Sequence, residues 1–160
     1  MSSGTLNIIE TSTPENPIYD RAALEQIFLP VDRMLQIDRV VRINGPLIVC
    51  ETDVTGHWVF PLHFPNDPIF PGTMLIEAAG QAMAIWVWHA GVRGRPRLVK
   101  TEAKFEHPVL PTDDKITIMA TVSLKRKSIC IGNVEIFTAN QKVAEVKATL
   151  VILAQLELGM

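Results

Sequence analysis

Most of the chain alternates between apolar and polar residues in the manner of β-strands, and one long apolar stretch interrupts this pattern. The pattern predicts strands at residues 35–43, 47–55, 97–107, 115–124, 128–138 and 141–153. Asn44 and Gly45 form a strong hairpin signal between the first two strands. Before them, residues 22–28 are expected to form a short helix that ends before Pro30.

The long apolar stretch has the composition of a helix. Residues 73–91 (TMLIEAAGQAMAIWVWHAG) are rich in Ala, Met and Leu, lack Pro and end at Gly91, which predicts about five helical turns. The stretch is apolar nearly all round, so we expect it to be buried on every side. A membrane span is the alternative, but Glu77 and Gln81 interrupt the run and amphipathic strands surround it. An α+β fold, with this helix embraced by a single antiparallel sheet, accounts for the pattern better.

The length of 160 residues suits one domain, with enough chain to bury a core without metal or disulfide support. We expect a flexible arm at residues 1–20, which are rich in Ser, Thr, Pro and Asn, and a single domain over residues 21–160. The N-terminus shows no signal peptide, so a cytoplasmic location is expected. Cys50 and Cys130 are expected to be buried free thiols.

The net charge of −2 gives no overall attraction to nucleic acid or to an anionic membrane. An acidic partner would therefore have to be met by a local basic patch. The sequence holds two basic clusters, Arg93, Arg95 and Arg97 after the predicted helix, and Lys125, Arg126 and Lys127 in a predicted turn. Such short runs are usually solvated, and docking of an acidic partner is the functional alternative.

Glu77 is the only charged residue in the predicted helix. Burying an ionised carboxylate without a partner is costly, so such a residue indicates either function or a structural ion pair. Gln81 lies four residues on, on the same helix face, where it can hydrogen-bond the carboxylate and orient it. A Glu at the surface, or one paired with a structural arginine, is the alternative.

His63 lies in a proline-rich loop that leads into the predicted helix. Four prolines between residues 61 and 71 restrict the backbone of this loop, as the positioning of a base requires. Gly72 then opens the helix, and its N–H would be an unpaired donor able to polarise an acyl oxygen. A base, an acid and an oxyanion donor at one helix N-terminus indicate removal of a proton next to a carbonyl, with departure of a β-hydroxyl. A thioester suits this chemistry because its α-proton is more acidic than that of an ester or an amide.

The stretch around these residues resembles the β-hydroxyacyl–acyl carrier protein dehydratases of fatty-acid synthesis. The resemblance is carried by His63-Phe64-Pro65-Asn66-Asp67-Pro68-Ile69-Phe70-Pro71-Gly72 and by Glu77-Ala78-Ala79-Gly80-Gln81. The spacing from histidine to carboxylate, and the places of Gly72 and Gln81, match that family. MLQIDRVV at 34–41, Lys104-Phe105 and Val109-Leu110-Pro111 are similar to its decanoyl-type branch, and the resemblance covers about residues 27–153.

The resemblance implies a hot-dog fold, in which a curved antiparallel sheet wraps a long central helix. It implies a homodimer, or a trimer of dimers, whose active sites take His63 from one subunit and Glu77 from the other. His63 would remove the α-proton, Glu77 would protonate or hold the leaving hydroxyl, and the Gly72 N–H would bind the thioester oxygen. No metal or organic cofactor is implied, because the phosphopantetheine of an acyl carrier protein carries the substrate. The basic clusters would dock this acidic carrier protein.

Some residues depart from the family pattern. The acid is Glu77, as in the general dehydratase branch, whereas the decanoyl-type branch, which also isomerises the double bond, usually has Asp. Leu62 replaces the glycine that precedes the histidine in the general branch, and PVDRML at 30–35 stands where that branch has an HRYPF-like segment. This mixture suits a specialised pathway and leaves isomerase activity open. The acyl chain length, and the choice between carrier protein and CoA, also stay open.

Two rival functions belong to different classes. A hot-dog acyl-CoA thioesterase would share the fold and the helix carboxylate, but it would hydrolyse the thioester, and such enzymes generally lack the loop histidine. A non-catalytic acyl-binding subunit of a synthase would not need to keep both His63 and Glu77. His57, His89 and His107 show no zinc-motif spacing, so we expect structural or surface roles for them and no metal.

Overall fold

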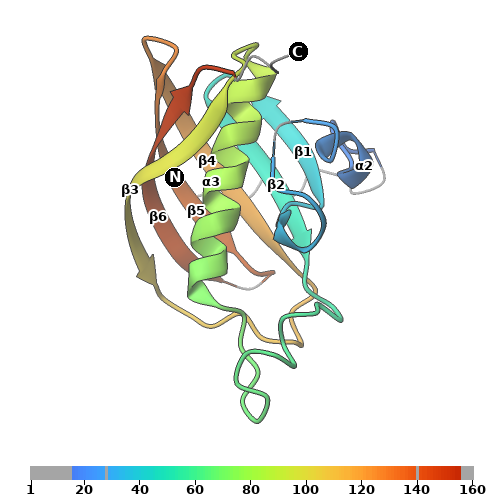
Figure 1. The fold of residues 1–160 in the computed structure, drawn as a ribbon. Coiled ribbons are helices and arrows are strands. Elements are labelled where there is room, and N and C mark those ends of the chain that lie inside the picture. Colours follow the sequence, from blue (N-terminus) through green and yellow to red (C-terminus); the bar gives the residue numbers. More distant parts are fainter. Residues whose placement is uncertain (1–15, 28, 140, 156–160) are drawn as a thin grey trace.

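The computed structural model describes residues 16–27, 29–139 and 141–155. In these residues a six-stranded antiparallel sheet curves around one long helix (Figure 1). The strands are β1 (Arg39–Asn44), β2 (Leu47–Asp53), β3 (Arg95–Phe105), β4 (Lys115–Lys125), β5 (Ile129–Phe137) and β6 (Lys142–Leu153). The helical segments are α2 (Arg21–Leu24), the 3-10 helix η1 (Asp32–Met34) and α3 (Gly72–His89). The strand order is β1-β2-β4-β5-β6-β3, so β3, which follows α3 in the chain, forms an edge of the sheet.

Tight turns join the strands in two of the hairpins of the sheet. Gly45 adopts a φ of 57° between β1 and β2, which confirms the turn predicted there. Arg126 and Lys127 adopt φ angles of 54° and 56° between β4 and β5. Two successive residues with positive φ form a turn whose backbone twist matches the right-handed twist of the two flanking strands. Such turns are therefore favoured in hairpins with two-residue loops.

Helix α3 packs on the sheet through small or flexible side chains. Ala79, Ala82, Met83 and Ile85 are fully buried. A Cβ atom on Gly132 of β5 would lie 2.7 Å from Sδ of Met83, closer than real contacts allow. The absence of a side chain at Gly132 therefore permits the helix to approach the sheet at this point.

The helix expected at residues 22–28 is shorter in the structure. α2 makes one turn, which Asp20 caps by accepting a hydrogen bond from the Ala23 N–H at 2.8 Å. It then gives way to a tighter i→i−3 bond from the Gln26 N–H to the Ala23 carbonyl. The predicted short helix is therefore present but ends at Leu24, and residue 28 of the expected range lies outside the described residues.

The strand expected from residue 35 begins later, at Arg39. Residues 35–38 precede the β1 ladder, because the Gln36 N–H donates to a side chain of α3 instead of a neighbouring strand. Upstream, Ile18 and Tyr19 pair with Val40 of β1. Residues 1–15 of the expected arm lie outside the described residues.

One side of α3 is open in the single chain. Ile76, Glu77 and Gly80 are only half-buried, because the sheet of one chain does not close around the helix, so a single subunit provides the expected burial on every side only in part. A curved antiparallel sheet around a central helix is nevertheless the hot-dog fold, which confirms the predicted α+β class. In the part of the chain that the structure describes, no helix is both long and apolar enough to cross a lipid bilayer.

Candidate active site

The carboxylate expected to act as the acid lies in the second turn of α3, and a glutamine one turn later contacts it. Nε2 of Gln81 donates a hydrogen bond to Oε1 of Glu77 at 3.0 Å. Gln81 is buried, with 3% of its surface exposed, whereas Glu77 is half-buried. The i, i+4 spacing places both side chains on one helix face, as the sequence predicts.

Two backbone groups, one at the end of η1 and one just after it, hold the Gln81 amide in one orientation. The Gln36 N–H donates to Oε1 of Gln81 at 2.7 Å, and Nε2 of Gln81 donates to the Met34 carbonyl at 2.7 Å. Because an N–H can only donate and a carbonyl can only accept, these two bonds fix which end of the amide faces Glu77. The end that faces Glu77 is the donor, so a proton on this carboxyl group belongs on Oε2, the oxygen that does not accept from Gln81.

Glu77 opens onto a cleft of about 180 Å³ on the open side of α3, which we name the Glu77 cleft. Its lining comes from Leu29, Pro30, Ile76, Glu77, Gly80, Gln81, Ala84, Pro96, Arg97, Leu98 and Leu150. Most of these side chains are apolar, and the polar groups are few. Such a lining suits a ligand that combines an apolar tail with one reactive polar group.

His63 lies in the loop between β2 and α3, which projects beyond the N-terminal end of α3 (Figure 1). The His63 N–H donates to the Val59 carbonyl at 2.9 Å, and Phe64 adopts a φ of 52°. A positive φ is uncommon in a residue other than glycine and is found where surrounding structure constrains a turn. The loop thus holds the histidine backbone in a sharply turned conformation.

The ring of His63 is oriented by a backbone carbonyl. Nδ1 of His63 lies 2.8 Å from the carbonyl oxygen of Ile69. A carbonyl oxygen only accepts hydrogen bonds, so Nδ1 carries the proton of the neutral ring and Nε2 carries the lone pair. The contact therefore selects the tautomer in which Nε2 can act as a base.

Gly72 is the first residue of α3, as the sequence predicts. Within residues 16–27, 29–139 and 141–155, its N–H has no hydrogen-bond acceptor, as is usual in the first turn of a helix. A cleft of about 510 Å³ opens at this point and is lined by Ile69, Phe70, Gly72, Leu75 and residues 105–109. A Cβ atom at position 72 would lie 3.0 Å from the Phe105 ring, so glycine keeps the helix N-terminus open to this Gly72 cleft.

The proposed catalytic groups fall into two sets in a single chain. Ile69, which accepts from His63, lines the Gly72 cleft together with Gly72 itself. Glu77 lines the other cleft, on the open side of α3. In one chain, the candidate base therefore contacts a residue of the cleft that holds the candidate oxyanion donor, whereas the candidate acid lines a different cleft.

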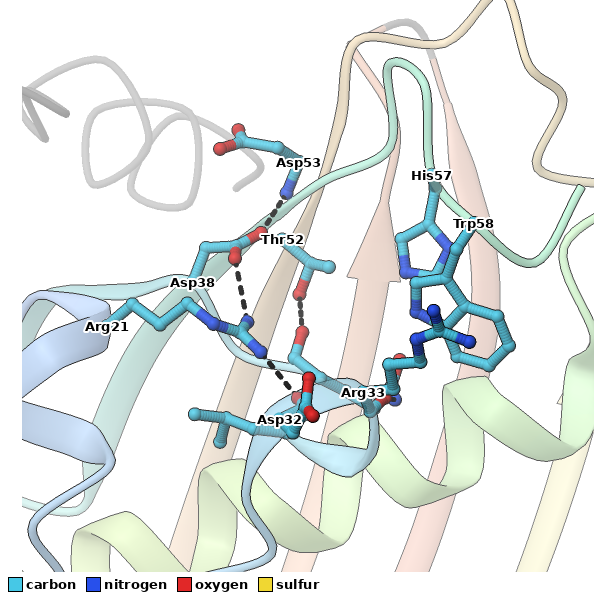
Figure 2. A pocket seen from close by; sticks show the side chains of 10 residues that line it. Arg21, Asp32, Arg33, Asp38, Thr52, Asp53, His57 and Trp58 are labelled. Atoms are coloured by element: carbon cyan, nitrogen blue, oxygen red, sulfur yellow. Dashed lines mark hydrogen bonds and ion pairs between the residues drawn. The ribbon is translucent and has the colours of Figure 1, made fainter.

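A third cleft, of about 270 Å³, borders the segment that holds Gln81 (Figure 2). In its wall, Arg21 donates to the Asp38 carboxylate at 3.0 Å and to the Asp32 carbonyl at 2.6 Å. Asp38 also accepts from the Asp53 N–H at 2.6 Å. These bonds brace residues 32–38, which include the two backbone groups that orient Gln81.

The remaining histidines take structural or surface positions. The ring of His57 packs edge-on against Phe70, with centroids 5.1 Å apart, and burial lowers its pKa below the usual value. Nδ1 of His89 lies 2.6 Å from the Tyr19 hydroxyl, and His107 is exposed. Among the described residues, no three His, Cys, Asp or Glu side chains gather closely enough to hold a metal ion.

Both basic clusters lie at the C-terminal end of α3, away from the His63 loop (Figure 1). In the sheet, Arg95 pairs with Leu153, and Ile129, which follows the second cluster, pairs with Val151. The two clusters therefore flank the end of β6. The structure brings them together, but it does not bring them to the His63 and Gly72 of the same chain.

A curved sheet around a central helix, with a carboxylate on that helix and a histidine before it, defines a hot-dog protein. The chain belongs to the FabA-like domain family, which matches residues 29–147. The dehydratase heterocomplex ApeI:P from Xenorhabdus doucetiae is similar in structure, with a TM-score of 0.67 at 16% identity over 79% of this chain and 88% of that chain.

Thioesterases are similar in structure as well. A hypothetical thioesterase from Streptococcus pneumoniae TIGR4, solved with coenzyme A, has a TM-score of 0.59 at 16% identity over 74% of this chain and 88% of its own. A third similar structure, which is named for its operon and not for an activity, is the PaaI protein of the E. coli phenylacetic acid degradation operon, with a TM-score of 0.56 at 18% identity over 70% of this chain and 80% of its own. At these identities the similarity establishes the fold, which serves dehydratases and thioesterases alike.

Sequence reasoning missed the groups that support the site from a distance in the chain. The bond between Gln36 and Gln81 joins residues 45 positions apart, and its Gln36 partner is a backbone N–H that no side-chain motif can reveal. Phe105 belongs to the stretch that carries the family resemblance, but its position against Gly72 depends on how β3 pairs with β6.

Proposed function

We propose that this protein removes water from β-hydroxyacyl thioesters to give trans-2-enoyl thioesters, with His63 as the base and Glu77 as the acid. The observation that carries the proposal is the bond from Nδ1 of His63 to the Ile69 carbonyl at 2.8 Å. That bond leaves the Nε2 lone pair available, in a loop that leads directly to the open N–H of Gly72. Hydrolysis of a thioester would not require a histidine held in this way.

In the proposed reaction, Nε2 of His63 takes the proton from the α-carbon of the substrate. The electron pair of that C–H bond moves towards the thioester carbonyl, whose oxygen accepts the Gly72 N–H and is stabilised by it. The pair then forms the α,β double bond as the β C–O bond breaks. Oε2 of Glu77 supplies a proton to the departing hydroxyl, which leaves as water, and the proton on His63 passes to solvent as Glu77 is reprotonated.

The proposed active species is a homodimer, alone or as the unit of a trimer of dimers. β3 is an edge strand and exposes apolar side chains, with Leu98, Val99 and Phe105 exposed by 47%, 58% and 50%. An unpaired edge of this kind is a ready surface for another chain. A second copy that covers this edge and the open side of α3 would bring its Glu77 to the His63 of the first copy.

The proposed substrate carrier is an acyl carrier protein in the cytoplasm, and no metal or organic cofactor takes part. Its acidic surface would dock on the basic clusters at the C-terminal end of α3. The 18 residues of α3 span about 27 Å, so a carrier docked there is far from the His63 loop of the same chain. In the dimer, the C-terminal end of α3 of one chain would therefore have to lie close to the active site that contains His63 of the other chain.

The test is incubation of the protein with crotonyl, octenoyl and decenoyl thioesters of N-acetylcysteamine and CoA, followed by mass spectrometry. Hydration adds one water and keeps the thioester intact, and this is the expected product. His63→Ala and Glu77→Ala should each lower the turnover by roughly 10²–10⁴-fold, the usual contribution of a general acid or base. Circular dichroism checks that both variants keep the fold.

The two rival functions give different products in the same assay. Release of the free acid from the wild-type protein would overturn the proposal and identify a thioesterase. Binding of the thioesters without any turnover would overturn it in favour of a non-catalytic acyl-binding subunit. Hydration that survives in either variant at wild-type rate would remove that residue from the mechanism.

A further inference from the structure

The backbone segment at residues 32–38 holds the Gln81 amide from its middle. The Met34 carbonyl accepts from Nε2 of Gln81, and the Gln36 N–H donates to Oε1 of Gln81, both at 2.7 Å. The regular structure of this segment is one turn of 3-10 helix, η1, which begins at Asp32 with a φ of 53°. A positive φ is uncommon outside glycine and persists where surrounding contacts determine it. The position of the Gln81 amide therefore depends on what fixes this segment.

One side chain, Arg21 of α2, contacts both ends of the segment (Figure 2). Nη2 of Arg21 donates to the Asp32 carbonyl at 2.6 Å, at the start, and Nη1 donates to the Asp38 carboxylate at 3.0 Å, at the end. We name these two bonds the Arg21 clamp. A guanidinium is planar and holds its N–H donors in a rigid fork, so the clamp fixes the separation between the two ends. A flexible lysine ammonium would not do so.

The clamp is itself anchored to the sheet on both sides. Just before α2, the Tyr19 carbonyl accepts from the Val40 N–H of β1 at 2.9 Å. The other carboxylate oxygen of Asp38 accepts from the Asp53 N–H, at the end of β2, at 2.6 Å. The guanidinium therefore connects a segment that is paired with β1 to a carboxylate that is bound to β2.

We propose that Arg21 is a positioning residue for the acid: by clamping residues 32–38 it holds the Gln81 amide, and through this amide the carboxyl group of Glu77. This inference rests on the proposed function, because the orientation of Glu77 matters only if Glu77 is the acid. Arg21 lies before residue 29, where the match to the FabA-like family begins, so a part of the chain outside that match supports the site. Among the described residues, the lining of the Glu77 cleft does not include Arg21, so its effect falls on turnover and not on substrate binding.

The experiment is a double-variant cycle of Arg21→Ala and Gln81→Met, measured as kcat and KM for hydration of decenoyl-N-acetylcysteamine. Arg21→Ala alone should lower kcat by about 2–30-fold, the usual effect of a residue that acts through a network of contacts, and leave KM within about twofold. In the Gln81→Met background, Arg21→Ala should lower kcat no further, because the amide through which it acts is already absent. A purely structural effect of Arg21 would instead multiply with that of Gln81→Met. Multiplied losses, or an unchanged kcat in Arg21→Ala, would overturn the proposal.

Two matched variants separate the clamp from the charge of Arg21. Glu25→Ala removes the other ion pair of Arg21, an exposed one with Nε and Oε1 3.6 Å apart, and its kcat should follow the wild type. Arg21→Lys keeps the positive charge but cannot reach both ends of the segment, so its kcat should fall as in Arg21→Ala. Full activity in Arg21→Lys would show that the charge alone acts, and would overturn the clamp.

Hydrogen exchange of the Gln36 N–H, followed by NMR, tests the clamp without any activity. In Arg21→Ala this amide should exchange at least about tenfold faster, whereas the N–H of Met83, which is fully buried in α3, should stay as protected as in the wild type. Unchanged exchange at Gln36, or equally faster exchange at both amides, would overturn the proposal, and this result decides if the double variant does not fold. Failure of the proposed function is recognised separately, because the wild-type protein would then hydrate no thioester while the exchange at Gln36 still reports on the clamp.

Discussion

At the scale of single residues, the orientation of the proposed acid depends on one amide. Gln81→Met removes the donor to Glu77 and keeps a side chain of similar length. We expect kcat to fall by at least about tenfold with KM little changed, because the carboxyl proton is no longer confined to Oε2. The same change leaves the Gln36 N–H and the Met34 carbonyl without their partner, which should cost about 1–3 kcal/mol of unfolding free energy.

Gln36→Leu is the matched control for this prediction. It changes the neighbouring buried glutamine but keeps the backbone N–H that Gln81 accepts. Oε1 of Gln36 finds no partner among the described residues, whereas Nε2 donates to the Arg33 and Met34 carbonyls at 2.9 Å and 3.3 Å, so leucine loses hydrogen bonds within the same segment but leaves the amide of Gln81 in place. Urea unfolding and steady-state kinetics on both variants decide the point. Equal kcat values in the two variants would show that the amide does not position Glu77.

At the scale of elements, the approach of α3 to β5 depends on Gly132. Gly132→Ala forces its Cβ against Met83, so we expect a loss of about 1–3 kcal/mol in unfolding free energy from overpacking. Asn133→Ala, at the next and exposed position of the strand, should change stability by no more than about 0.5 kcal/mol. Urea denaturation measures both. Equal stabilities would mean that Met83 simply moves aside and that the contact does not constrain the fold.

The elements that the sequence predicts well are those whose signal is local. Helix α3 and the turn at Gly45 follow from composition, spacing and turn chemistry over a few residues. Gln81 could be assigned to Glu77 because the two are one helical turn apart. The burial of Cys50 and Cys130 as free thiols is confirmed as well.

The features that the sequence did not predict depend on contacts between distant segments. Residues 35–38 read as a strand, but the Gln36 N–H donates to α3, and a backbone bond to β2 appears only from Asp38 onwards. An open side of α3 is expected of one subunit of a homodimer, but the composition of the helix does not say which side is open, because a face that is covered by a second chain looks as apolar as one that is covered by its own. The same limit applies to the clefts, which are built from segments far apart in the chain.

At the scale of the whole molecule, the paired basic clusters predict how a carrier-bound substrate is recognised. Replacing Lys125, Arg126 and Lys127 with Glu should raise KM for a carrier-bound substrate by about tenfold at low salt and flatten its salt dependence, because exposed charges mainly steer association. The same triple variant should turn over N-acetylcysteamine thioesters like the wild type. An equal loss of activity on both substrates would show that the cluster has a structural role. Unchanged kinetics on both substrates would show that the cluster does not dock the carrier protein.

The central claim is that His63 of one chain works with Glu77 of another, and hybrid dimers test it most directly. Inactive His63→Ala and inactive Glu77→Ala proteins are mixed in equal amounts, allowed to exchange subunits, and assayed for hydration of decenoyl-N-acetylcysteamine. Half of the dimers become hybrids, and in each hybrid one of the two symmetric sites has both residues intact, so activity should return to about a quarter of the wild-type value. Mixtures that stay inactive after native mass spectrometry has shown subunit exchange would contradict the claim.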